Sequence, residues 1–373
     1  MAVLIGATLR ARLGRCPHVA RASAPVLVGD ILEDEDSMRL RTLWLCLLAG
    51  CSSPSTPAAD SDDAPLDPCT SANSLCAERV EIGAEVYLPV FRTHSLAEGD
   101  DRITRGLIVV HGTNRNADDY FQRGYQAAAD AGEQNRTIVV APHFQTTADG
   151  PAGDEPFWSS GGWKRGHLSL SEGPSPRVSS YAAIDRVVAL LSDRARFPGI
   201  KEIVVTGHSA GGQVVHRYAA SSQAEQTAPD VTFRYVVANP STYLYLRPER
   251  ANAADFSVPE ASVCPDFDDW HYGLEDRNTY ARALESDSIV AQLTGRDVRI
   301  LLGAADSLSA SLDVSCGANL QGPYRLARGQ TLRRFMDAFF PGHGHVESIV
   351  PGVGHSSADM WSSSVGLLSL FGS

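Results

Sequence analysis

The amino-acid sequence predicts an α/β protein in which helices cover both faces of a mostly parallel sheet. Apolar runs typical of buried strands alternate with segments whose apolar residues recur every three or four positions, as on one face of a helix. This alternation favours parallel strands joined by helical crossovers. At 373 residues the chain can bury a sizeable core, as one large domain or two smaller ones.

Residues 1–50 have the pattern of a leader and lipoprotein signal peptide. A basic start at 38–41 precedes a short apolar run at 42–50, too short to span a membrane, and Cys51 follows it. We expect Cys51 to be lipidated and to become the mature amino terminus of a bacterial cell-envelope lipoprotein or extracellular protein. An ordinary cleaved signal peptide is the alternative. Met38 is a candidate true start, and 1–37 would then be an upstream mistranslation or an unusually long leader.

The rest of the chain divides into a tether and one domain. Residues 51–68 are rich in serine, proline and aspartate, so we expect a flexible tether that buries no core. The domain is expected over 69–373. It opens with alternating apolar and polar residues over 78–92, which predict an antiparallel strand or hairpin.

A continuous apolar run over 106–110 predicts the next strand, buried on both faces. Asn116 can cap a helix from Ala117 to about Ala131, and 137–141 is the following strand. A long loop rich in glycine and aromatic residues comes next. The apolar spacing over 175–196 then predicts a helix.

The sequence from Gly207 to Gly211, which reads Gly-His-Ser-Ala-Gly, follows a β-branched run at 203–205 and precedes a helical pattern over 213–220. In this context the motif predicts a nucleophile elbow, a strained turn that projects the hydroxyl of Ser209 above the sheet. The glycines are small because the incoming strand and the outgoing helix nearly touch. The alternative is a glycine-rich turn with an idle serine.

A second motif, His111-Gly112-Thr113, ends the strand at 106–110. Acyl transfer needs backbone N–H groups aimed at the developing oxyanion. Beside a nucleophile elbow, one such group comes from the residue after the serine and another from a loop of this kind. We therefore assign the oxyanion hole to Ala210 and Thr113, with a plain strand-end turn as the alternative.

The carboxy-terminal part resumes the strand and helix alternation after an interruption. A strand at 233–238 precedes an aromatic, acidic insertion at about 239–293, which we expect to form a cap over the catalytic edge or, alternatively, a peripheral decoration. A strand at 298–303, a helix at 323–339 and a strand at 346–350 follow. Ser356 or Ser357 is expected to cap one final helix toward Leu370.

Asp306 and His355 each follow a predicted strand, so with Ser209 they give the order nucleophile, acid, base. In such a triad the histidine accepts the serine proton, and the carboxylate fixes the tautomer of the imidazole. Other residues compete for these roles. Asp313 is the backup acid, His343 and His345 are expected at the surface or in a turn, and His208 and His216 flank the nucleophile.

The expected substrate pocket combines the residue before the nucleophile with aromatic side chains from the long loop and the insertion. Its members are His208, Trp158, Trp163, Tyr243 and Trp270. The loop aromatics could equally plug the loop onto the core instead of forming a rim.

Four cysteines remain after Cys51: Cys69, Cys76, Cys264 and Cys316. In an oxidising compartment they suggest two disulfides, for which three connectivities exist, and we favour Cys69 with Cys76 and Cys264 with Cys316. The spacing does not fit a zinc site, and we expect no metal and no other cofactor. A net charge of −12 argues against a nucleic-acid partner, and we expect a monomer.

Together these motifs resemble those of the α/β-hydrolase superfamily over roughly 78–373. Within it, the chain is similar to secreted esterases of the polyhydroxybutyrate-depolymerase and feruloyl-esterase kind. The resemblance implies an exported serine hydrolase that cleaves small esters or polyesters through an acyl-enzyme, with the membrane reached only through the lipid anchor. The serine argues against haloalkane dehalogenases and epoxide hydrolases, which use aspartate there. A serine peptidase of the same fold and a non-catalytic surface-binding lipoprotein are the alternatives.

Overall fold

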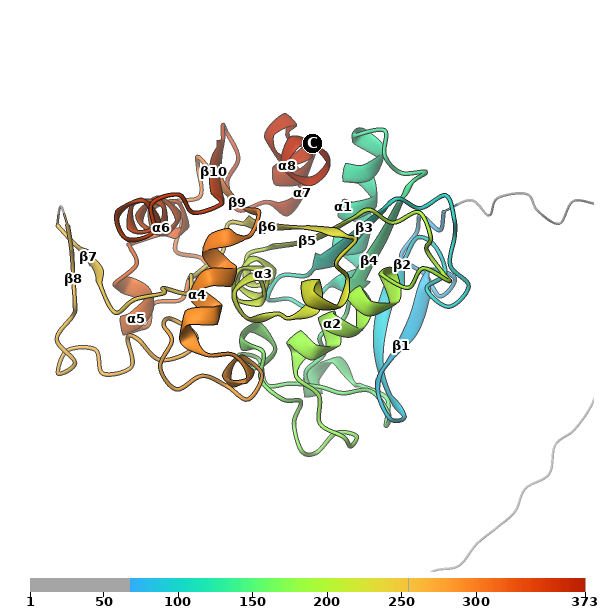
Figure 1. Cartoon of the computed structure of the whole chain (residues 1–373), viewed down its shortest axis with the longest axis horizontal. Coiled ribbons are helices and arrows are strands. Elements are labelled where there is room, and N and C mark those ends of the chain that lie inside the picture. Colours follow the sequence, from blue (N-terminus) through green and yellow to red (C-terminus); the bar gives the residue numbers. More distant parts are fainter. Residues whose placement is uncertain (1–67, 254, 373) are drawn as a thin grey trace, which may run out of the picture. The chain divides into compact units, whose positions relative to one another are not determined.

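The computed structural model describes residues 68–253 and 255–372. The predicted leader, Cys51 and nearly all of the predicted tether lie outside the described residues. The central feature is an eight-stranded sheet (Figure 1). In spatial order its strands are β1 (Ala77–Gly83), β2 (Val86–Arg92), β4 (Thr137–Pro142), β3 (Arg105–Val110), β5 (Glu202–His208), β6 (Thr232–Ala238), β9 (Val298–Gly303) and β10 (His345–Val350).

Strand direction matches the sequence-based expectation. β1 pairs antiparallel with β2, and β2 pairs antiparallel with β4, whereas every pair from β4 to β10 is parallel. The predicted opening hairpin and the mostly parallel sheet are therefore confirmed. Because the carboxyl ends of parallel strands meet at one edge, the loops after β3, β5, β6, β9 and β10 are brought together there.

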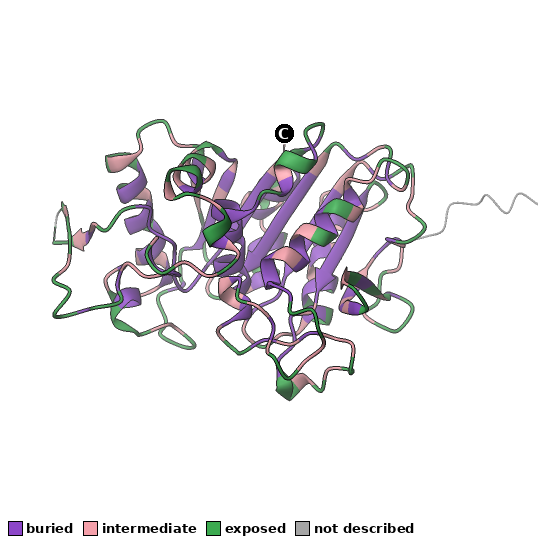
Figure 2. Ribbon diagram, turned by 60° about the horizontal axis from the view of Figure 1, so that its bottom comes forward, coloured by how far each residue is buried: buried purple, intermediate pink, exposed green. Residues whose placement is uncertain are grey.

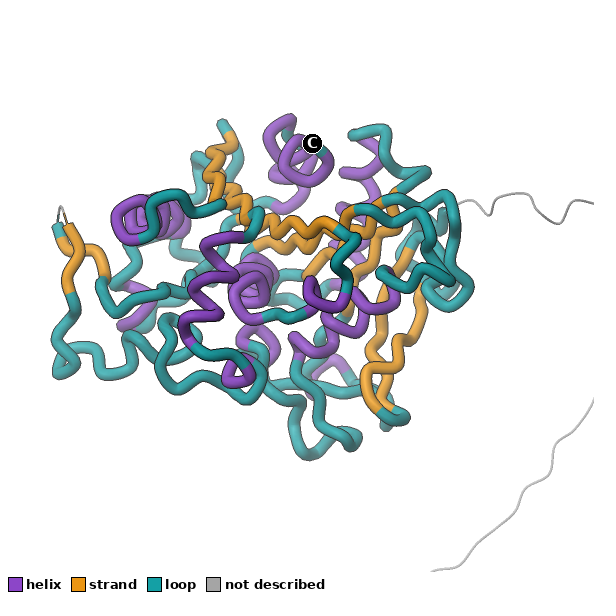
Figure 3. Tube along the Cα trace, in the orientation of Figure 1, coloured by secondary structure: helices purple, strands orange, loops and turns teal. Residues whose placement is uncertain are grey.

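Helices cover both faces of this sheet (Figures 1 and 3). One face carries α1 (Ala117–Asp130), α7 (Ser357–Ser362) and α8 (Ser364–Phe371). The other carries α2 (Ser180–Leu191), α3 (Ala210–Ser221), α4 (Ser286–Gly295) and α6 (Arg325–Phe339). The short helix α5 (Cys316–Asn319) lies between β9 and α6 in the chain.

The central strands β3, β4 and β5 are buried on both sides, as Figure 2 shows. Successive residues of one strand point to opposite faces, so Ile108 and Val110 join the core under α2 and α3, whereas Leu107 and Val109 join the core under α1. Each fully buried aliphatic side chain of this size contributes about 1.5–3 kcal/mol of transfer free energy. This two-sided burial explains the continuous apolar run.

Two helical predictions differ from the structure at their ends. The helix predicted over 175–196 is shorter, because the side chain of Ser179 accepts a hydrogen bond from Tyr181 N and starts α2 there. The single helix predicted after His355 is two helices. Ser356 caps α7, and Ser363 starts α8 by accepting from Gly366 N.

The segment 239–293 is mostly loop in Figure 3. It enters the core at Tyr243, forms a two-stranded hairpin of β7 (Arg250–Asn252) and β8 (Asp255–Ser257), and ends in α4, which packs on α3. Across the described residues, we find no helix with the length and apolar character to span a membrane. No cluster of three or more potential metal ligands occurs among them either.

Candidate active site

Ser209 lies in a strained turn between β5 and α3. Its φ of 59° and ψ of −117° place it in a region that non-glycine residues rarely adopt, and its amide donates to Ala238 O at 2.9 Å. A Cβ at Gly211 would lie 2.1 Å from Val110 O, and one at Gly207 would lie 2.4 Å from the carbonyl carbon of Gly211. Only glycine fits these two positions, as the elbow motif requires.

Of the three residues of the predicted triad, His355 lies within hydrogen-bond distance of both others. His355 Nε2 is 3.0 Å from Ser209 Oγ, and His355 Nδ1 is 2.7 Å from Asp306 Oδ2. The Asp306 side chain is fully buried, whereas that of His355 is 25% exposed and accessible from the surface. This geometry fits an imidazole whose Nδ1–H donates to the carboxylate, leaving Nε2 free to accept the serine proton.

Asn239, directly after β6, joins the end of β9 to the loop that carries His355. Its side-chain oxygen accepts from Gly303 N at 2.8 Å, and its amide donates to Gly354 O at 3.1 Å. Its φ of 42° is also positive. Sequence reasoning missed this residue, and the only available signal was its position after a predicted strand at the sheet edge.

Ala210 and Thr113 are the residues predicted to supply the oxyanion hole. Within the described parts of the chain, neither N–H donates to another group. Ala210 is the first residue of α3, so the positive end of the helix dipole adds to its amide. Both residues line the cavity in front of Ser209.

His111 holds the loop that carries Thr113. Its Nδ1–H donates to Gly112 O at 2.9 Å, and its Nε2 accepts from Phe144 N at 2.9 Å. Complete burial lowers the pKa of His111 to about 3, so the ring stays neutral and keeps this tautomer. His111 therefore has a positioning role in the loop.

The competing histidines lie elsewhere or lack the right contacts. His208 is buried with its ring centroid 4.5 Å from that of His355, and burial holds its pKa well below the usual value. His216 accepts from Leu244 N inside the core. His343 and His345 lie at the opposite end of β10 from His355. The prediction that His345 lies at the surface or in a turn is wrong. His345 is buried, and its ring donates to Leu293 O at 3.0 Å.

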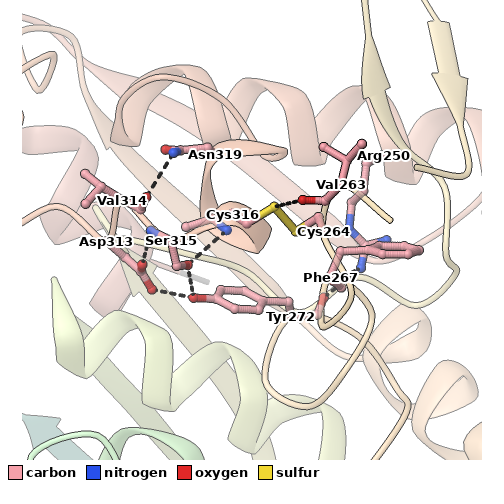
Figure 4. Close-up of a disulfide and its surroundings, with 11 residues drawn as sticks. Arg250, Val263, Cys264, Phe267, Tyr272, Asp313, Val314, Ser315, Cys316 and Asn319 are labelled. Atoms are coloured by element: carbon pink, nitrogen blue, oxygen red, sulfur yellow. Dashed lines mark hydrogen bonds between the residues drawn. A yellow bond between two sulfur atoms is a disulfide. The ribbon is translucent and has the colours of Figure 1, made fainter. Parts of the chain in front are cut away.

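Asp313 does not contact His355. Its carboxylate accepts from the hydroxyl of Tyr272 at 2.7 Å and from Ser315 N at 3.0 Å, as drawn in Figure 4. Burial raises the pKa of Asp313, but hydrogen bonds from Tyr272 and Ser315, together with the charge of Arg217, outweigh burial and hold the pKa below its usual value. The backup acid is thus an ionised group in the cavity wall.

Two cavities meet at Ser209. The histidine-side cavity, of about 430 Å³, is lined by His355, Ser356, Ser357, Tyr120, Arg123 and His208 among others. The lysine-side cavity, of about 450 Å³, is lined by Lys164, Arg165, Gln213, Ser241, His271 and Asp313 among others. Thr113, Ser209 and Ser311 line both, so the two spaces adjoin at these residues.

The four predicted aromatic pocket residues do not line a cavity at Ser209, whereas His208 does. Trp158, Trp163 and Tyr243 are fully buried in the core. Trp163 stacks on Phe144. The indoles therefore anchor the long loop to the core and do not form a pocket rim. Trp270 lines a third cavity that Ser209 does not line, and its Nε1 donates to Arg165 O at 2.8 Å.

The structure contains two disulfides, Cys69–Cys76 and Cys264–Cys316. The second joins the segment 239–293 to the loop that leaves Asp306, and Figure 4 shows it beside Tyr272 and Asp313. It therefore lies next to the wall of the lysine-side cavity.

Comparison with protein-family models and with curated protein sequences gave no match. Among solved structures, poly(aspartic acid) hydrolase-1 from Sphingomonas sp. KT-1 is similar, with 24% identity, a TM-score of 0.54, and coverage of 79% of this chain and 97% of that one. A poly(3-hydroxybutyrate) depolymerase from Bordetella parapertussis has 22% identity, a TM-score of 0.54, and coverage of 78% and 89%.

These similarities and the sheet order define the fold class: the described domain has the α/β-hydrolase fold. The identities are too low to carry activity or substrate from those proteins to this chain.

Proposed function

We propose that this protein is a serine hydrolase that cleaves carboxylic esters through an acyl-enzyme on Ser209. The observation that carries the proposal is the hydrogen-bonded series from Ser209 through His355 to the buried Asp306. Two unused amides face the same space. A scaffold that only binds has no need of this arrangement.

In the proposed reaction, His355 Nε2 takes the proton of Ser209 as Oγ attacks the ester carbonyl. Asp306 stabilises the imidazolium, and the amides of Ala210 and Thr113 stabilise the oxyanion. His355 then gives its proton to the departing alcohol. Water then attacks the acyl carbon as it loses a proton to the same nitrogen, and His355 returns that proton to Ser209 Oγ as the bond to the acyl group breaks and the acid leaves.

This sequence of proton transfers indicates which part of the substrate each cavity would hold. The leaving alcohol must lie within reach of His355 Nε2, and His355 lines only the histidine-side cavity of the two. The alcohol portion therefore belongs there, and the acyl portion belongs in the lysine-side cavity. Small esters and polymer chain ends are both candidate substrates.

The test uses a fluorophosphonate probe and nitrophenyl esters of graded acyl length on the intact protein. Wild type should be labelled at Ser209 and should hydrolyse esters, whereas Ser209→Ala should lose both properties while keeping its circular dichroism spectrum. Ser171→Ala, at an exposed loop serine, is the matched control. Folded wild type with neither labelling nor ester cleavage would favour the non-catalytic binding protein, and cleavage of amides in preference to esters would favour the peptidase.

We further propose that the protein is exported and lipidated on Cys51, which lies outside the described residues. The signal pattern at 38–51 and the two disulfides support this, because disulfides persist in oxidising compartments. Metabolic labelling with a fatty-acid analogue should mark wild type and not Cys51→Ser. Equal labelling of the two would show that the lipidation signal is misread.

A further inference from the structure

The lysine-side cavity has an unusual charge for this protein. The chain carries a net charge of −12 and only two lysines, Lys164 and Lys201. One of them, Lys164, lines this cavity together with Arg165, directly beside the nucleophile and the oxyanion loop. An acidic protein thus concentrates positive charge on one side of Ser209.

These cations lack anionic partners. Lys164 Nζ donates to a neutral group, the hydroxyl of Thr113, at 3.0 Å. Within the described chain, neither Lys164 nor Arg165 has a carboxylate within 4.0 Å, and the Arg165 guanidinium has no hydrogen bond to another described residue. In the histidine-side cavity, by contrast, Arg123 lies 3.6 Å from Asp119.

A third cation lies behind the wall, and among the described residues it has no carboxylate partner within 4.0 Å either. The guanidinium of Arg217 is fully buried and donates to Thr242 Oγ1 at 2.7 Å and to His271 O at 3.1 Å. Buried guanidinium groups usually have a charged partner. Here neutral oxygens hold Arg217 in place, so its positive charge adds to the field in the cavity.

Negative charge in the wall is small. Asp313 is the one carboxylate that lines the cavity among the described residues, and Tyr272 and Ser315 already engage it. His271 is neutral, because burial holds its pKa well below the usual value. Two cations therefore face one carboxylate that is already hydrogen-bonded.

The pKa of Lys164 reflects this uncompensated positive charge. Burial lowers the pKa of Lys164, and the neighbouring Arg165 and Arg217 lower it further, against a smaller opposing effect of Asp313. A bound anion would relieve this repulsion. The cavity thus has an excess of positive charge that would favour binding of a negatively charged group.

We infer that the lysine-side cavity binds a carboxylate on the acyl portion of the substrate, through Lys164 and Arg165. The preferred substrates are then esters of acids that carry a second, free carboxylate. This inference rests on the proposed function, because it assigns the acyl portion to the cavity that His355 does not line.

The experiment compares two esters that differ only in charge: 4-nitrophenyl hydrogen adipate and 4-nitrophenyl methyl adipate. At low ionic strength, wild type should have a kcat/KM about tenfold or more higher for the hydrogen adipate. The ratio should fall as salt is added, because salt screens partly exposed charges. Lys164→Gln and Arg165→Gln should each lower the ratio several-fold.

Arg165→Gln is the cleaner of the two variants because it leaves the bond from Lys164 to Thr113 in place. The control is Arg282→Gln, which removes the same charge from an exposed side chain on a different cavity and should keep the wild-type ratio. Equal losses in Arg165→Gln and Arg282→Gln would show that only the net charge of the protein matters, and would overturn the inference.

A second measurement separates this inference from the proposed function. Ser209→Ala, which cannot turn over, should bind the hydrogen adipate ester at least several-fold more tightly than the methyl ester in calorimetric titration. Equal binding overturns the inference whatever the wild type cleaves. Wild type that hydrolyses both esters equally would overturn the inference and leave the esterase assignment in place. If the probe leaves Ser209 unlabelled, it is the proposed function that fails.

Discussion

Arg325 and His355 contact different oxygens of the same carboxylate. Arg325 Nη1 lies 3.4 Å from Oδ1 of Asp306, whereas His355 Nδ1 lies 2.7 Å from Oδ2. The side chains of Arg325 and Asp306 are both fully buried. Arg325 also donates to Ala310 O at 2.8 Å, and so it holds the start of the loop that follows Asp306.

Arg325→Met should therefore reduce activity and stability together. Removing one partner of a buried ion pair typically costs about 3–5 kcal/mol, because the other charge stays buried without compensation. We expect kcat/KM for nitrophenyl acetate to fall about tenfold or more, with partial recovery in Arg325→Lys. Urea unfolding and steady-state kinetics measure the two effects.

The control for this variant is Arg328→Met. Arg328 is also fully buried, but it donates to Ser241 O at 2.6 Å and to Gly322 O at 2.8 Å and does not touch Asp306. It should lose stability with a smaller loss of kcat. Equal losses of kcat in the two variants would assign Arg325 to stability alone.

Asp306→Asn should lose about three to four powers of ten in kcat, because an amide cannot stabilise the imidazolium or select its tautomer. Asp313→Asn should lose far less for neutral esters, because its carboxylate contacts Tyr272 and not His355. It should instead raise the preference for hydrogen adipate over methyl adipate, since a negative charge leaves the lysine-side cavity. A larger kcat loss in Asp313→Asn than in Asp306→Asn would mean that the acid is misassigned.

Low pH should loosen the loop that carries Thr113, because the carboxylate of Asp149 becomes protonated. Burial raises the pKa of Asp149, but hydrogen bonds from Arg115 and Thr146 outweigh it and lower the pKa to about 2. Arg115 also donates to Thr113 O at 3.1 Å. Because the folded pKa lies below the unfolded value of 3.8, the stabilisation is complete above about pH 4 and is lost as the pH falls toward 2.

This lowering of the pKa of Asp149 corresponds to about 2 kcal/mol of folding free energy. Asp149→Asn should be less stable than wild type by up to that amount at pH 6, and the gap should shrink as the pH falls from 4 to 2. Urea unfolding at each pH is the measurement. Asp154→Asn removes an exposed ion pair with Arg79 and should change stability little. A gap for Asp149→Asn that stayed constant with pH would exclude ionisation of Asp149 as its cause.

The sequence predicts the sheet and the elbow well because both depend on local patterns. Strands buried on both faces need continuous apolar runs, and the close contact at Gly207 and Gly211 allows no side chain. The end of each predicted strand then places Ser209, Asp306 and His355 at one edge of a parallel sheet. No long-range information is needed for that step.

What the sequence did not predict depends on contacts between distant segments. The indole of Trp163 fits a rim or a plug equally well until Phe144, from a different loop, is known to stack on it. Arg325 and Asn239 belong to no motif, and their roles follow from hydrogen bonds made across the fold. The same holds for the unpaired charges of Lys164 and Arg165.

The disulfide Cys264–Cys316 offers the last prediction, because it joins the segment 239–293 to the loop after Asp306. The bond closes a sequence separation of 52 residues. By the chain-entropy model this closure contributes about 4 kcal/mol, with strain and residual denatured-state structure usually lowering the value. Ser311 and Asp313, which line the lysine-side cavity, lie between Asp306 and Cys316.

Replacing Cys264 and Cys316 together by serine should therefore lower the melting temperature and reduce activity on bulky acyl groups more than on nitrophenyl acetate. Cys69→Ser with Cys76→Ser is the control, because that bond spans only 7 residues, far from Asp306 in the sequence, and its loss should not change the ratio of the two activities. Peptide mapping of the unreduced protein tests the pairing directly. A peptide linking Cys69 or Cys76 to either partner would refute it, and an unchanged ratio of bulky to small ester hydrolysis in the Cys264 and Cys316 variant would show that the bond stabilises the fold without shaping the acyl site.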